Sequence, residues 1–69
     1  MITKEAKIQL LKNEITMYEN SLYVLEVRHR VAKKTGGDKE VLSNIEKEMT
    51  NAEFGLDELK VVLKELDSA

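Results

Sequence analysis

Two runs of mostly apolar residues, one on each side of Gly36-Gly37, repeat at alternating steps of three and four residues. Such a repeat fills the a and d positions of heptads and is typical of helices that pack as coiled coils. Each run covers about four heptads, so the sequence predicts two long helices. We call the repeated positions the core seam: Ile8, Leu11, Ile15, Tyr18, Leu22, Leu25, His29, Ala32, Leu42, Ile45, Met49, Ala52, Leu56, Leu59, Leu63 and Leu66.

The two runs match each other when the chain folds back at the glycine pair. Counted outward from Gly37, each seam residue of the first run faces one of the second, from Ala32 with Leu42 to Ile8 with Leu66. One continuous helix would instead hold both glycines in its interior, at about 1 kcal/mol each. The sequence therefore predicts an all-α fold, an antiparallel two-helix coiled-coil hairpin.

Capping residues indicate where the helices end. Lys33-Lys34 precede the glycines and Asp38 follows them, which is the expected order of a helix stop and a new N-cap. Thr3 is placed to cap the first helix. We expect helices at about 3–35 and 38–67, joined by the Gly36-Gly37 turn.

The length of the chain limits how stable such a hairpin is by itself. Residues 1–69 form a single helical hairpin domain, and one core of this size contributes only about 3–5 kcal/mol. The chain has no cysteine and one histidine, so disulfides and zinc clusters are excluded. We therefore expect a homo-oligomer, most simply a dimer that forms a four-helix bundle, or a complex with a protein partner.

The two sides of the predicted hairpin differ in polarity. The side that carries the e positions is wholly charged and is expected to face water: Glu5, Lys12, Glu19, Glu26, Lys33, Glu46, Glu53, Lys60 and Asp67. On the g side, the neighbouring c positions of the first helix form an apolar stripe at seven-residue spacing: Leu10, Met17, Val24 and Val31. Left exposed, such a stripe exceeds the apolar patches that soluble monomers usually carry.

Small residues lie beside this stripe. Ser21 and Gly55 are expected to oppose each other near mid-length, where they would form a notch for another backbone. We call the following residues the docking face: Leu10, Met17, Ser21, Val24, Val31, Val41, Gly55 and Val62. The alternative is that these are ordinary surface aliphatics, since over half of a protein surface is apolar. Regular spacing opposite a charged side favours an interface.

The residues around the turn form a basic tip: Arg28, His29, Arg30, Lys33 and Lys34. Residues 27–39 carry a net charge of +4 and residues 40–69 carry −5. One hypothesis is contact with a nucleic acid or phosphate. The favoured interpretation is structural, because cations stabilise a helix C-terminus and no aromatic residues interleave with them as a stacking platform. His29, without other potential ligands or a catalytic constellation, is interpreted as covering the end of the seam.

No catalytic motif is present. There is no Gly-rich phosphate loop, nucleophile elbow or His-x-x-x-His pattern, so we expect no enzyme, cofactor, metal or small-molecule substrate. No apolar run reaches the ~18 residues that span a bilayer, and residues 1–5 include charges, so we expect neither membrane contact nor a signal peptide but a cytoplasmic protein.

The predicted function is a non-enzymatic protein–protein interaction module that docks through its apolar face. Such a module would serve as a small adaptor, inhibitor or assembly factor. The alternative is a small nucleic-acid-binding hairpin that uses the basic tip, which the net charge of −2 disfavours. The identity of the partner and the relative direction of two hairpins stay open.

Overall fold

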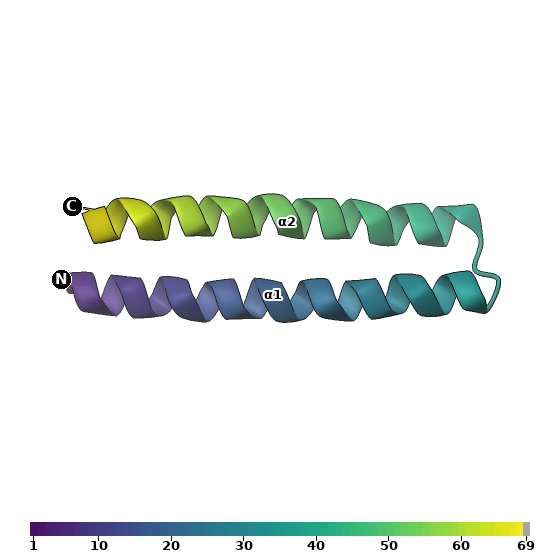
Figure 1. Cartoon of the computed structure of the whole chain (residues 1–69), viewed down its shortest axis with the longest axis horizontal. Coiled ribbons are helices and arrows are strands. Elements are labelled where there is room, and N and C mark those ends of the chain that lie inside the picture. The colour runs from purple at the N-terminus through teal and green to yellow at the C-terminus, as the bar shows by residue number, and fades with distance from the viewer. Residues whose placement is uncertain (69) are drawn as a thin grey trace.

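The chain folds into two long antiparallel helices that lie side by side, with both termini at one end and the turn at the other (Figure 1). The structure is a computed structural model that describes residues 1–68. Helix α1 covers Lys4–Lys34 and helix α2 covers Lys39–Ser68, and the molecule measures 50 × 18 × 14 Å. The predicted all-helical hairpin is confirmed. Within residues 1–68, neither helix is long and apolar enough to cross a membrane.

The turn is built from specific backbone hydrogen bonds at the glycine pair. Gly36 adopts φ +77°, the left-handed region that L side chains disfavour. The Gly37 N–H then donates to the Ala32 carbonyl at 2.7 Å, which is the six-to-one bond of a Schellman motif. A side chain at Gly37 would also lie only 3.0 Å from that carbonyl oxygen. Glycine is therefore favoured at both positions, at Gly36 by the backbone conformation and at Gly37 by the close approach of the Ala32 carbonyl.

Polar side chains cap the start of each helix. Thr3 Oγ1 accepts a hydrogen bond from the Ala6 N–H at 3.1 Å, and Asp38 Oδ1 accepts from the Val41 N–H at 2.9 Å. Each cap satisfies one of the N–H groups that have no partner in the first turn of a helix. Asp38 follows the glycines directly, so one short segment ends α1 and begins α2.

The core lies along the line where the helices meet. All sixteen residues of the core seam are buried or half-buried, as expected for residues that lie between the two helices. Leu25 and Leu56 are the most buried, at 8% and 9% exposure, and no side chain in residues 1–68 is completely buried. Two helices alone therefore cover their apolar faces only in part.

Gly55 stands within helix α2 because of how the two helices pack against each other. A Cβ atom at Gly55 would lie 2.5 Å from Cε1 and 3.0 Å from Cζ of Tyr18. The aromatic ring of α1 thus occupies the space that a side chain on α2 would need. The predicted notch between Ser21 and Gly55 was wrong in this respect, because the Tyr18 ring fills the site that the glycine leaves open.

Candidate functional site

The apolar stripe of α1 stays exposed in the folded hairpin. Leu10, Met17, Val24 and Val31 keep between 46% and 60% of their surface accessible to solvent. Residues seven apart are two helical turns apart, so the stripe runs about 31 Å along one face of α1. The fold therefore leaves a long apolar strip uncovered next to the core seam.

A groove beside this stripe lies at the middle of the hairpin. It has a volume of about 400 Å³ and is lined by Asn20, Ser21, Val24, Leu25, Arg28 and Glu48. Five of these residues belong to α1, and only Glu48 comes from α2. Leu25 is one of the two buried core residues, whereas Val24 belongs to the stripe. The groove therefore joins the docking face to the best-covered part of the core.

Helix α2 contributes less to the docking face than α1. Val41 is 45% exposed, whereas Val62 and Gly55 are half-buried. Gly55 is covered by the Tyr18 ring, so its role in the hairpin is intramolecular. Ser21 is exposed and lines the groove. The accessible docking face is consequently the α1 stripe with Ser21 and Val41.

The opposite side of the hairpin is polar along its whole length. The nine charged residues predicted at e positions, from Glu5 to Asp67, are all exposed. This agrees with the predicted difference between the two sides. The e positions therefore present charged groups to solvent along both helices.

His29 of the basic tip makes a contact between the helices. Its Nε2 atom lies 3.0 Å from Oε1 of Glu46, a distance that allows a hydrogen bond and, with a protonated ring, an ion pair. Glu46 was not among the residues predicted to contact His29. The helix pairing could have predicted this contact. His29 is expected to face Ile45, and Glu46 follows Ile45 directly in the sequence. This contact joins α1 to α2 near the turn.

The other residues of the tip point into solvent. Arg28, Arg30, Lys33 and Lys34 are all exposed, and they lie in the last two turns of α1. Lys33 and Lys34 occupy the last turn, where cations interact favourably with the carbonyl ends of the helix. The tip is thus an exposed basic surface, and its Arg28 also lines the groove beside the stripe.

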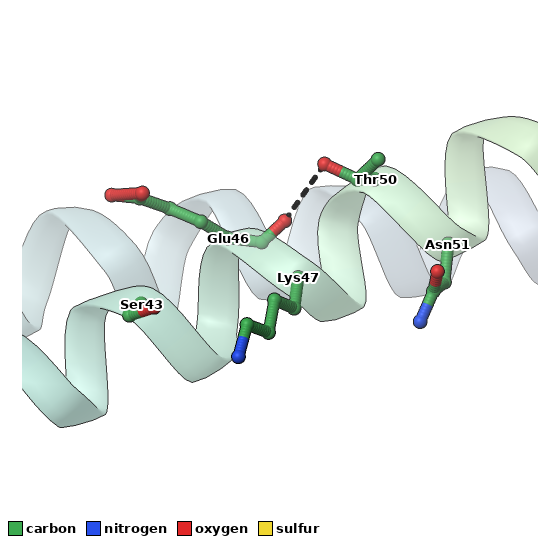
Figure 2. A pocket seen from close by; sticks show the side chains of 5 residues that line it. All are labelled: Ser43, Glu46, Lys47, Thr50 and Asn51. Carbon is green, nitrogen blue, oxygen red and sulfur yellow. Dashed lines mark hydrogen bonds between the residues drawn. The ribbon is translucent and has the colours of Figure 1, made fainter.

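A second hollow of about 380 Å³ lies on the outer face of α2. Its lining residues are Ser43, Glu46, Lys47, Thr50 and Asn51, all from this one helix. Figure 2 shows the Glu46 carboxylate and the Lys47 amine pointing away from each other, while Thr50 Oγ1 donates to the Glu46 carbonyl at 3.0 Å. Because these polar groups do not converge on a common point, the hollow does not form a ligand site.

Chemical groups that could act together are sparse in residues 1–68. No three His, Asp or Glu side chains in this range are grouped so that they could hold a metal ion. The same range contains no buried polar or charged residue. The exposed faces of the helices are therefore the candidate functional surfaces among the residues described. No family model matches the chain, and neither a curated protein nor a solved structure matches it significantly.

Proposed function

We propose that this chain is a non-enzymatic protein–protein interaction module that docks through the exposed α1 stripe. The observation that carries this proposal is that Leu10, Met17, Val24 and Val31 stay about half exposed on one side of the hairpin. Covering what remains exposed of these side chains contributes about 1 kcal/mol each, because complete burial of an aliphatic side chain contributes about 1.5–3 kcal/mol. A small adaptor, inhibitor or assembly factor would use such a surface.

The charged side of the hairpin also supports the α1 stripe as the docking surface. Its residues are exposed and carry charges of both signs, so they keep that side in water and leave the stripe as the surface that a partner covers. A hairpin in which Leu25 and Leu56 are the buried core residues among positions 1–68 also gains more from a partner than a larger domain would.

The proposal is tested by comparing one substitution on each side. Val24→Glu places a charge in the middle of the stripe, and we expect it to lower the oligomer mass in sedimentation equilibrium or to abolish capture of a partner. Glu19→Lys changes a charge on the polar side, and we expect it to do neither. Both positions are exposed, so neither change disturbs the core seam, and circular dichroism checks that the helices persist. Equal behaviour of the two variants would show that the sides are assigned wrongly.

A second candidate function is nucleic-acid binding through the basic tip. It is favoured by the four exposed cations Arg28, Arg30, Lys33 and Lys34 and by the net charge of +4 over residues 27–39. Phosphate contacts weaken steeply as salt rises, with a slope that grows with the number of phosphates neutralised, whereas apolar docking changes little. Binding of an RNA hairpin that falls tenfold or more between low and moderate salt, and that Arg30→Ala weakens further, would support this candidate instead.

A further inference from the structure

The hairpin exposes more surface than a folded monomer of its mass. Its accessible area is 5511 Å², whereas the usual area for a folded monomer of 7.9 kDa is about 4400 Å². The difference of about 1100 Å² exceeds the roughly 800 Å² that each partner buries in a standard protein interface. The elongated hairpin therefore has enough excess surface to form an interface of standard size with another chain.

The polarity of α2 restricts what can cover the α1 stripe. The stripe occupies the c positions of α1, and the c positions of α2 are all polar and exposed: Asn44, Asn51, Glu58 and Glu65. Two hairpins that stack with α1 on the partner's α2 would set each stripe residue against an amide or a carboxylate. That arrangement would remove polar groups from water without giving them partners. On the docking face α2 adds only Val41 as an exposed apolar side chain, so the longest apolar surface that can cover the stripe is the stripe of a second copy.

Resting on the proposed function, we infer that the docking face binds a second copy of this chain, with the two α1 helices antiparallel about a two-fold axis near Ser21. The stripe is spaced evenly about the point between Asn20 and Ser21. Leu10 then meets Val31 of the partner subunit, and Met17 meets Val24 of the partner subunit. The small Ser21, which lines the groove at mid-length, lies where the two helices cross the axis.

Charge favours the antiparallel direction over the parallel one. In the antiparallel dimer, Glu14 faces Arg28 of the partner subunit, and the symmetry repeats this contact. Both residues are exposed, and neither makes an ion pair within the hairpin of residues 1–68. A parallel dimer would place two basic tips side by side. The antiparallel dimer separates them by about 30 Å, well beyond the screening length of about 8–10 Å.

Engineered cysteines test this geometry directly, because the natural chain contains none. In the antiparallel dimer the two copies of residue 21 lie about 8–10 Å apart, the usual spacing of packed helices, and the two copies of residue 31 lie about 31 Å apart. A short bismaleimide should therefore link the Ser21→Cys variant about tenfold or more faster than the Val31→Cys variant. A mixture of the Leu10→Cys and Val31→Cys variants should give the linked heterodimer.

The possible outcomes distinguish a failure of the antiparallel dimer from a failure of the proposed docking function. If Val31→Cys alone links as fast as Ser21→Cys, the copies are parallel and the inferred geometry is overturned, while the docking face stands. If sedimentation equilibrium of the unmodified chain shows only monomer and no variant links, the second copy is overturned as the partner. Circular dichroism confirms for each variant that the hairpin is folded.

A charge exchange tests the same arrangement without changing the apolar stripe. Glu14→Arg sets like charges against each other at two symmetric positions, so we expect dimerisation to weaken by roughly tenfold. Glu14→Arg combined with Arg28→Glu restores opposite charges and should recover most of this loss. Equal weakening by the single and double variants would overturn the Glu14–Arg28 contact and with it the antiparallel direction.

Discussion

The contact between Tyr18 and Gly55 predicts an unusual response to a glycine substitution in a helix. Replacing glycine by alanine in a helix interior normally stabilises a protein by about 1 kcal/mol. Here the new Cβ would lie 2.5 Å from Cε1 of Tyr18, about 1 Å inside the usual carbon–carbon contact of about 3.5 Å. The half-buried ring would have to move within the core seam, and overpacking of this kind costs about 1–3 kcal/mol. We expect Gly55→Ala to destabilise the hairpin by about 1 kcal/mol.

A double-mutant cycle isolates the ring as the cause. Tyr18→Leu removes the atoms that would meet the new Cβ, so in that background Gly55→Ala should stabilise the hairpin by about 1 kcal/mol. The coupling free energy between the two sites is then about 2 kcal/mol. Asn51→Ala is the control, because Asn51 is exposed and lies one turn before Gly55 on α2. This substitution should stabilise the hairpin by about 0.5 kcal/mol both in the natural chain and in the Tyr18→Leu variant.

The measurement is urea unfolding followed by circular dichroism, at one fixed protein concentration so that association affects all variants alike. Equal stabilisation by Gly55→Ala in both backgrounds would refute the reasoning, because the ring would then not occupy the site. A variant of unchanged hairpin stability but lower oligomer mass would instead assign Gly55 to a contact with another chain.

The turn gives two further predictions, both measured by the same unfolding assay. Gly36→Ala should destabilise the hairpin by about 1 kcal/mol, because φ is +77° there, whereas Gly36→Asn should lose less; equal losses would argue against a left-handed cap. Asp38→Ala removes the acceptor of the Val41 N–H and should cost about 1 kcal/mol, whereas Asp38→Asn should stay close to the natural chain. An Asp38→Ala variant as stable as Asp38→Asn would show that the cap contributes little.

The hairpin could be predicted from the sequence because separate signals agree on it. The glycines, the Asp38 cap and the symmetric spacing of the core seam all place the fold-back at the same point. A register counted from the turn also predicts which residues become half-buried, since helical periodicity determines the direction of each side chain around the axis. The direction of each side chain around the helix axis is also sufficient to predict which residues form the charged side and which form the stripe.

The contacts of Tyr18 and His29 were not predicted, because they depend on how a side chain extends along the helix axis. The register places Tyr18 opposite Leu56, yet its ring reaches the neighbouring Gly55, because a long aromatic side chain extends beyond its own heptad layer. The contact from His29 to Glu46 has the same origin. Periodicity alone cannot show that the glycine serves packing inside the hairpin.

At the middle of the hairpin, a buried core residue lies next to the proposed dimer contact. Leu25 is one of the two buried core residues, and the groove that it lines with Val24 and Ser21 lies at the same height. A second copy centred on Ser21 would therefore cover the hairpin at its best-packed layer and continue that layer outward. Toward the turn the seam holds Ala32 and the polar His29, which supply little apolar area. The hairpin is thus best packed where the partner would bind, so a second copy would extend a buried layer that is already formed.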